Sequence, residues 1–211
     1  MIVNNIDKIK KLLKFGENTY YFIQVIQRRR ENPELPKVEI QRGYWYITSL
    51  KELDIHIPKI IMLCSTYNAR AYISLVPRSS EKFAKLCVVE FSQRVFNNSY
   101  TNIFSVPQKV ALNKDTIQSG IFPKPLWLLD IDKLEDLGII LDSIRNKTSI
   151  KVVETIDTVR GMHLIVECFN PKKELGAFIK LDNNNYSLSG TGKEEFTVIE
   201  TCNTLLYAVT P

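Results

Sequence analysis

The sequence excludes several classes of protein through what it lacks. No apolar run approaches the roughly 18 residues of a membrane-spanning helix, and the first residues lack the basic-then-apolar order of a signal peptide. The four cysteines lie far apart and form no Cys-x-x-Cys pair, which excludes a zinc ribbon or a disulfide-bonded scaffold. We therefore expect a cytoplasmic protein with no membrane partner.

Glycine-rich nucleotide-binding motifs are also missing. The 8 glycines are scattered along the chain and form no Gly-x-Gly-x-x-Gly motif. The segment 187–193 resembles a P-loop, but Ser187 replaces its first glycine, and Glu194 replaces the hydroxyl residue that would bind Mg²⁺. We therefore interpret this segment as an ordinary loop rather than as a phosphate-binding site.

Charge is distributed unevenly along the 211 residues. Residues 1–125 hold 19 Lys and Arg against 10 Asp and Glu, whereas residues 126–211 hold 9 against 13. A basic half followed by an acidic half is typical of a polyanion-binding surface beside a carboxylate metal site. Chance variation in surface charge explains the same asymmetry, so both interpretations stay open.

Local patterns predict alternating helices and strands in the first half. The predicted elements are a helix capped by Asn4 or Asn5 and ended by Gly16, strands at 20–27, 44–48 and 69–75, a helix at 50–67 interrupted near Pro58, and an amphipathic helix that starts at Ser79 or Ser80 and runs to Val95. Residues 98–124 have no clear period and contain prolines, so we expect them to connect two halves.

The second half follows a different pattern. It predicts strands at 126–132, 150–155, 161–169 and 177–181, a helix at 134–144, a short helix at 171–176, and final strands at 196–199 and 205–209. The order β-α-β-β-α-β is that of a ferredoxin-like or RNA-recognition-like unit. We predict an α/β fold of the α+β type with mixed sheets. In this single domain, 1–211, a basic α/β half (1–125) packs on an RNA-recognition-like half (126–211), with a cleft between them.

An apolar strand of the second half ends in two aspartates. Asp130 and Asp132 are alternate residues of one strand, so their side chains share a face and their Cα atoms lie about 7 Å apart. Two carboxylates at this spacing can bind Mg²⁺ or Mn²⁺. Asp132 can instead cap the following helix, with Glu135 completing a capping box, but that alternative leaves Asp130 without a role in an apolar strand.

A histidine occupies a neighbouring predicted strand. His163 lies on the face opposite to Met162 and Leu164, and Arg160 and Gly161 directly precede this strand segment. An imidazole beside an arginine suits a wall that binds a triphosphate. A histidine satisfied within the fold is the alternative for any single histidine, and it is the role expected for the other one, at position 56.

Together these segments resemble the first two motifs of the archaeo-eukaryotic primase superfamily, whose catalytic core includes an RNA-recognition-like unit. The segments 20–34, 68–73 and 203–207 are similar to small primase-polymerase-type proteins of phages and mobile elements, so the resemblance covers nearly the whole chain. It implies that Asp130, Asp132 and His163 are catalytic. In this resemblance the two aspartates bind divalent metal, and His163, in its Gly161-x-His163 setting, contacts the phosphates of the incoming nucleotide.

The third motif departs from the superfamily pattern. The resemblance implies a further acidic metal ligand shortly before Asn203, where this chain has Thr201. Glu200 can serve through a strand bulge, and Asp182, at the end of the predicted strand 177–181, is the other candidate metal ligand. Without either of them the metal site holds two carboxylates.

Basic and aromatic residues supply candidate contacts to nucleic acid. We assign Arg70, in a segment that resembles the superfamily, and Arg160 to the nucleotide phosphates. The candidates for nucleic-acid phosphates are Arg28, Arg29, Arg30, Arg78 and Lys124. The aromatic residues 44–46 can stack bases, or they can belong to the core while the arginine run is solvated, and the sequence favours neither alternative.

These residues predict a primase-polymerase-like nucleotidyltransferase that uses Mg²⁺ or Mn²⁺, nucleoside triphosphates and a single-stranded DNA or RNA template. A helicase or other replication proteins are expected partners. The second hypothesis is a non-catalytic nucleic-acid-binding protein that keeps the primase fold with an incomplete metal site. The third is a metal-dependent nuclease that uses the same two aspartates.

Overall fold

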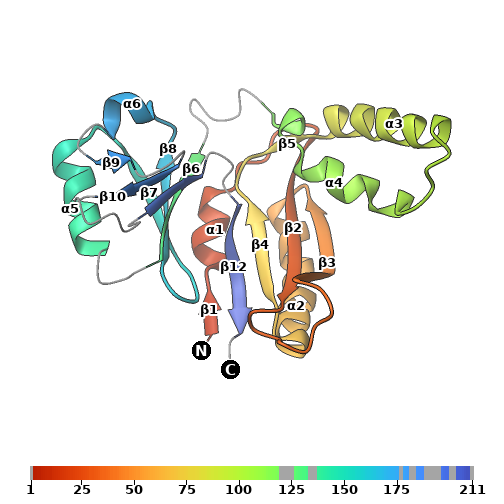
Figure 1. Ribbon diagram of the computed structural model, residues 1–211, viewed down its shortest axis with the longest axis horizontal. Coiled ribbons are helices and arrows are strands. Elements are labelled where there is room, and N and C mark those ends of the chain that lie inside the picture. The colour runs from red at the N-terminus through yellow and green to blue at the C-terminus, as the bar shows by residue number, and fades with distance from the viewer. Residues whose placement is uncertain are drawn as a thin grey trace.

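The computed structural model describes residues 2–118, 126–132, 137–175, 178–180, 184–187, 196–199 and 203–209. In these ranges the chain forms two antiparallel sheets and six α-helices, which confirms the predicted mixed α/β fold of the α+β type. Figure 1 shows the two sheets side by side, the second one with α5 and α6 on the left. No helix in the described part of the chain has both the length and the apolarity needed to cross a bilayer.

The first sheet combines strands from both ends of the sequence. Its order is β1-β12-β4-β2-β3, every pairing is antiparallel, and the short strand β5 also pairs with β2. The strands are β1 (Ile2–Asn4), β2 (Thr19–Arg28), β3 (Glu39–Ile47), β4 (Arg70–Ser74), β5 (Arg78–Ser79) and β12 (Asn203–Val209). Because β12 lies between β1 and β4, the two sheets do not coincide with the halves 1–125 and 126–211.

The second sheet has the order β7-β8-β6-β11-β10-β9 and is also antiparallel. Its strands are β6 (Leu126–Ile131), β7 (Val152–Asp157), β8 (Met162–Glu167), β9 (Ile179–Lys180), β10 (Asn185–Ser187) and β11 (Phe196–Ile199). The helices of this part are α5 (Leu137–Lys147) and α6 (Pro171–Glu174). Of the predicted strand 177–181, the described residues Ile179 and Lys180 are paired, at the sheet edge, and β11 is the strand beside β6.

Alternation along β2 gives the first sheet two different faces. Tyr21, Ile23 and Val25 point to one face and share a core with α1 (Ile6–Leu12) and α2 (Leu50–Tyr67). Leu128 and Ile165 of the second sheet belong to the same core, so one hydrophobic core joins the sheets. The alternate residues of β2 point to the opposite side, which we name the outer face; they are Tyr20, Phe22, Gln24, Ile26 and Arg28.

Helix α2 is continuous, although Pro58 predicted an interruption. Pro58 cannot donate a hydrogen bond to the carbonyl group of Asp54, but both residues are exposed, so water can satisfy that carbonyl. The helix begins where the Ser49 hydroxyl accepts from the Glu52 N–H at 3.2 Å. It ends at Asn68, whose φ of 44° is left-handed and ends the helix.

The predicted N-terminal helix forms, but its two asparagines act differently. The Asn4 side chain accepts a hydrogen bond from the Ile6 N–H at 3.1 Å. The Asn5 side chain makes no cap and instead donates to the carbonyls of Asp157, at 2.8 Å, and Leu205, at 3.1 Å. It thereby links β7 of the second sheet to β12 of the first. The helix ends at its seventh residue rather than at Gly16.

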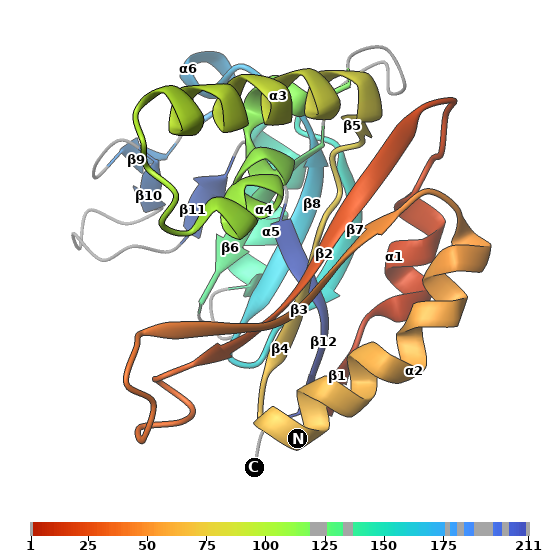
Figure 2. The same ribbon diagram turned by 90° about the vertical axis from the view of Figure 1, so that its right-hand side faces the viewer.

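The expected connection between the halves contains a helical projection. The helix α3 (Ser80–Phe96) is followed by η1 (Ile103–Ser105), α4 (Val106–Leu112) and η2 (Lys114–Thr116), and α4 contacts α3. No residue of α3 is buried. Figures 1 and 2 show α3 and α4 extending from the first sheet, on the side away from the second sheet. We name residues 80–116 the arm.

Candidate functional site

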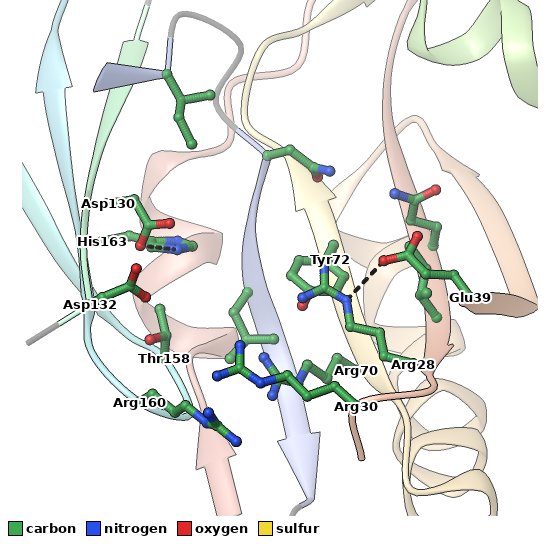
Figure 3. A pocket seen from close by; sticks show the side chains of 15 residues that line it. Arg28, Arg30, Glu39, Arg70, Tyr72, Asp130, Asp132, Thr158, Arg160 and His163 are labelled. Carbon is green, nitrogen blue, oxygen red and sulfur yellow. Dashed lines mark ion pairs between the residues drawn. The ribbon is translucent and has the colours of Figure 1, made fainter. Parts of the chain in front are cut away.

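A cleft of about 440 Å³ lies between the outer face of the first sheet and the second sheet (Figure 3). One wall comes from β2, β3, β4, β12 and the loop after β2, and the other from β6, β8, β11 and the turn between β7 and β8. The lining residues are Gln24, Ile26, Arg28, Arg30, Glu39, Arg70, Tyr72, Asp130, Asp132, Thr158, Arg160, His163, Ile199, Asn203 and Leu205.

Asp130 and Asp132 reach the cleft from the end of β6 (Figure 3). On the same face of the strand, Leu128 enters the core that joins the sheets, whereas Ile131 on the other face packs in the core with α5. The predicted alternation is thus confirmed, and it places both carboxylates on the cleft side. The Asp130 side chain is half-buried and Asp132 is exposed.

His163 lies opposite Asp130 in the pairing of β8 with β6. Its Nε2 atom is 3.3 Å from Oδ1 of Asp130, and its Nδ1 atom is 2.8 Å from the hydroxyl oxygen of Thr204. An ionised carboxylate only accepts, so we assign the proton of a neutral imidazole to Nε2, and Nδ1 then accepts from the Thr204 hydroxyl. The imidazole is thereby held between a residue of its own sheet and a fully buried residue of β12.

Gly161 allows the β7–β8 turn to approach the end of β6. A Cβ atom at this position would lie 1.9 Å from the carbonyl oxygen of Ile131 and 2.9 Å from the Cα atom of Asp132. The Gly161 N–H donates to the Thr158 hydroxyl at 2.9 Å, which fixes the turn. The close backbone approach expected from the sequence therefore exists, and it brings Arg160 to the same cleft as Asp132.

Arg70 lies on the facing wall and is held by the loop that follows β2. Its guanidinium forms an ion pair with Glu31, and the two side chains are only 12% and 9% exposed. The Asn68 side chain donates to the carbonyl of Glu31 at 3.0 Å, and the Asn32 side chain donates to the carbonyl of Asn68 at 3.1 Å. These bonds lock the loop that carries Arg30 against the start of β4.

A tyrosine lies between the arginines of this wall. The guanidinium carbon of Arg28 is 5.1 Å from the ring centre of Tyr72, and Arg28 also pairs with Glu39 at 3.1 Å. Burial raises the pKa of Tyr72 above its ordinary value, although the charges of Arg28 and Arg70 oppose this shift. The phenol therefore stays protonated at neutral pH and is a neutral hydrogen-bonding group of the cleft.

The cleft combines positive charge with a carboxylate edge. Four arginines and three acidic residues line it. The side chains of Arg30 and Arg160 are exposed and form no ion pair within the described ranges, and Figure 3 shows both reaching into the cleft. Arginines without an acidic partner are available to bind a phosphate group.

One predicted nucleic-acid contact is wrong. Arg78 is 2% exposed and its guanidinium donates to the carbonyl of Asn113 and to the Thr116 hydroxyl, both at 2.7 Å. Burial lowers the pKa of this guanidinium from its ordinary value. Arg78 therefore fastens the base of the arm, and it cannot reach a nucleic acid.

The remaining predicted residues are distributed differently. Arg29 is exposed but does not line the cleft. Lys124, Asp182 and Glu200 lie outside the described residues, so the third acidic ligand stays a prediction. For the aromatic residues 44–46 the alternatives were base stacking and a place in the core. Tyr44 is exposed on the outer face, whereas Trp45 packs against the core that joins the sheets.

The aspartates limit which metal the cleft can hold. Among the described residues, no group of three or more His, Cys, Asp or Glu side chains is arranged to hold a metal ion. Asp130 and Asp132 offer carboxylate oxygens, which suit Mg²⁺ or Mn²⁺, and Mg²⁺ often binds one or two carboxylates together with substrate phosphates. The pair therefore fits an ion that is also bound by phosphate.

Four further residues of the site, for which the sequence indicates no role, are Thr204, Thr158, Tyr72 and Glu39. Thr204 belongs to the segment 203–207 noted for its resemblance, but only the position of β12 reveals that its hydroxyl reaches His163.

No family model, no curated protein and no solved structure matches the chain.

Proposed function

We propose that the protein is a primase-polymerase-like nucleotidyltransferase that adds nucleotides on a single-stranded template. The observation that carries this proposal is the make-up of the cleft, in which Asp130, Asp132 and His163 lie on one wall and four arginines share the same space. A carboxylate pair beside an arginine cluster suits a divalent ion and a polyphosphate bound next to each other.

Asp130 and Asp132 would hold Mg²⁺ or Mn²⁺ at the end of β6. When bound there, the ion supplies Lewis-acid stabilisation of the charge that develops on the transferred phosphoryl group. The protein contributes the two carboxylates at fixed positions on a strand, and the close approach of Gly161 fixes the nearby turn.

The arginines bind and orient the triphosphate. Arg30 and Arg160 extend into the cleft from loops on opposite walls, and Arg28 and Arg70 are fixed by Glu39 and Glu31. The Nε2 proton of His163, which faces Asp130 in the free protein, can be donated to a phosphate oxygen instead. Catalysis in this proposal consists of positioning and of electrostatic stabilisation.

The second sheet adds support to the resemblance with the primase superfamily. Four neighbouring strands of this sheet have the order β11-β6-β8-β7, with α5 between β6 and β7 in the sequence and the short α6 after β8. This is the antiparallel arrangement of a β-α-β-β-α-β unit, with two further short strands, β9 and β10, before the last one. The proposed RNA-recognition-like half rests on this order.

A non-catalytic nucleic-acid-binding protein is the second candidate. It is favoured by the pairing of Asp130 with His163, which gives this carboxylate a partner within the protein. In that case the arginines of the cleft bind the backbone of a single strand, and the aspartates shape the site without a metal.

Nucleotide incorporation tests the proposal. Wild-type protein is incubated with a single-stranded template, with and without an annealed primer, and with labelled ribo- or deoxyribonucleoside triphosphates and Mg²⁺ or Mn²⁺. We expect new product, and we expect Asp130→Asn and Asp132→Asn each to reduce its rate on the order of 10²-fold or more, because each removes a metal-binding charge. Asp142→Asn, an exposed aspartate on α5, is the matched control and leaves the rate unchanged.

Each result separates the hypotheses. Incorporation by wild type that is lost in both aspartate variants supports the proposal. A template shortened in the presence of metal would identify a nuclease instead. Salt-sensitive binding of the single strand without incorporation, unaffected by metal or by the aspartate variants, would establish the non-catalytic protein.

A further inference from the structure

Three aromatic rings are exposed at the far end of the arm. Phe96 is 85% exposed, Tyr100 is 56% exposed and Phe104 is 91% exposed. They recur every four residues through the end of α3, the following turn and η1. Exposed aromatic side chains of this size are unusual on a surface and indicate a binding site.

The charged residues nearest to these rings in the sequence are basic. Between Glu90 and Asp115 the sequence holds Arg94, Lys109 and Lys114 and no acidic residue. Lys109, on α4, is exposed, whereas Lys114 lies next to Asn113 at the base of the arm. The distal arm is thus complementary to an anionic partner.

The polar residues between the rings distinguish this surface from a continuous apolar patch. Positions 97–99, 101 and 102 are Asn, Asn, Ser, Thr and Asn, and they are exposed. Insertion of this segment into a lipid layer would bury amide and hydroxyl groups at a cost. Aromatic rings that alternate with hydrogen-bonding and basic side chains are typical of surfaces that bind single-stranded nucleic acid.

The arm and the cleft belong to the same face of the first sheet. Tyr20 and Phe22 on the outer face pack against Phe83 of α3 and Ala111 of α4. The next outward residues of β2 are Gln24, Ile26 and Arg28, which line the cleft. Figure 2 shows α3 and α4 over one end of this sheet. The exposed ring of Tyr44 lies on the same face, with its centre 6.1 Å from that of Phe22.

We infer that the distal arm binds single-stranded nucleic acid outside the cleft, with bases stacked on Phe96, Tyr100 and Phe104 and phosphates near Lys109. This inference rests on the proposed function for the identity of the strand, which is the template. The 17 residues of α3 give the arm a reach of about 25 Å from the sheet, so a strand must extend beyond the cleft to contact its end.

Strand length therefore tests the inference. Binding of fluorescein-labelled oligothymidylates of about six and about 20 nucleotides is measured by anisotropy at fixed salt, without nucleotides or divalent metal. Wild type binds the longer strand more tightly. The variant Phe96→Ala/Phe104→Ala is expected to bind the longer strand about 10-fold or more weakly, because two stacking rings are lost, and to bind the short strand as wild type does.

Conservative variants isolate stacking from general apolarity. Phe96→Trp/Phe104→Trp is expected to retain affinity for the long strand, whereas Phe96→Leu/Phe104→Leu is expected to lose it. The matched control is Ile55→Ala, which removes an exposed apolar side chain from α2. Thermal unfolding of every variant checks that the fold is intact, which we expect because the substituted side chains are exposed.

Other outcomes would overturn the inference. Equal affinity of wild type and the alanine variant for the long strand would do so, as would full affinity of the leucine variant. Binding to phosphatidylserine vesicles that is lost in the alanine variant, while affinity for the long strand is unchanged, would assign the arm to a membrane. A dimer that only the alanine variant dissociates, with strand binding unchanged, would assign it to a second copy. If wild type incorporates no nucleotide but the arm effect persists, the proposed function fails and this inference stands.

Discussion

At the scale of single residues, the imidazole of the cleft is anchored by the sheet that does not carry it. His163 belongs to β8, and its Nδ1 atom bonds to Thr204 of β12 in the other sheet. Thr204 is fully buried and does not line the cleft, so it is a positioning residue that acts through His163.

Replacing Thr204 by valine removes this bond while keeping the shape of the side chain. We expect Thr204→Val to raise the KM for the nucleotide about 10-fold, which corresponds to the loss of about 1.4 kcal/mol of binding, with a smaller change in kcat. Steady-state incorporation kinetics measure both constants. Thr204→Ser retains a hydroxyl and is expected to restore the KM, whereas equal defects in both variants would contradict a role through the hydrogen bond.

Gly161 is a residue of the site at which the structure leaves no room for a side chain. In Gly161→Ala the new methyl group would overlap the backbone of Ile131, which cannot move without disturbing β6. We expect a loss of about 2–4 kcal/mol in the free energy of unfolding, measured by urea denaturation. Gly138→Ala is the control, because its Cβ would meet no atom within 4 Å and alanine favours the helix, so stability should be unchanged or higher by up to about 1 kcal/mol. A small effect at position 161 would show that the turn adapts.

At the scale of elements, the sequence predicted the helices and strands whose patterns depend on residues close together in the chain. Strands β2, β6 and β8 lie within a few residues of their predicted bounds, because alternation of side chains is a local pattern. The helix of the arm was also predicted, but its periodic apolar stripe does not report burial, since no residue of α3 is buried. Helical spacing identifies the element and not what covers it.

Arginines illustrate the same limit. Arg28, Arg30 and Arg78 look alike in the sequence, yet two of them line the cleft and the third fastens the arm. Their difference arises from packing between distant segments, which composition does not contain. The sequence could therefore place Asp130 and His163 together, because they lie on strands related by a short predicted motif. It could not distinguish basic residues that line the cleft from those that hold the fold together.

Arg78→Lys tests the structural role of this arginine. Lysine cannot reproduce the guanidinium fork that holds the Asn113 carbonyl and the Thr116 hydroxyl, so we expect the free energy of unfolding to fall by about 2 kcal/mol. Affinity for single-stranded DNA should stay within twofold of wild type. Arg29→Lys, at an exposed position, is the control for stability. A selective loss of DNA affinity in Arg78→Lys would show instead that Arg78 contacts the nucleic acid, as the sequence predicted.

At the scale of the whole molecule, the two sheets are joined by a shared core and by one buried side chain. Asn5 is 1% exposed, donates to carbonyl groups of both β7 and β12, and accepts from the Asp157 N–H at 3.3 Å. The sequence suggested it only as a helix cap, because its partners are about 150 and 200 residues away.

Asn5→Ala should loosen the two sheets from each other. The substitution leaves buried backbone groups without partners, and we expect a loss of about 2–4 kcal/mol in the free energy of unfolding. Hydrogen exchange should show reduced protection of β7 and β12 together. Asn4→Ala removes only the hydrogen bond to the Ile6 N–H at the helix end and should cost about 1 kcal/mol or less. Equal effects of both substitutions would show that the Asn5 bonds do not couple the sheets.

The central position of β12 has a consequence for biosynthesis. Residues 203–209 supply the strand between β1 and β4, and two of them, Asn203 and Leu205, line the cleft. While the ribosome is still making the preceding residues, β1 and β4 lack their shared neighbour and His163 lacks its hydroxyl anchor. The pocket is therefore complete only after residues 203–209 have been made and have paired with β1 and β4, a step that closes the long loop between β1 and β12.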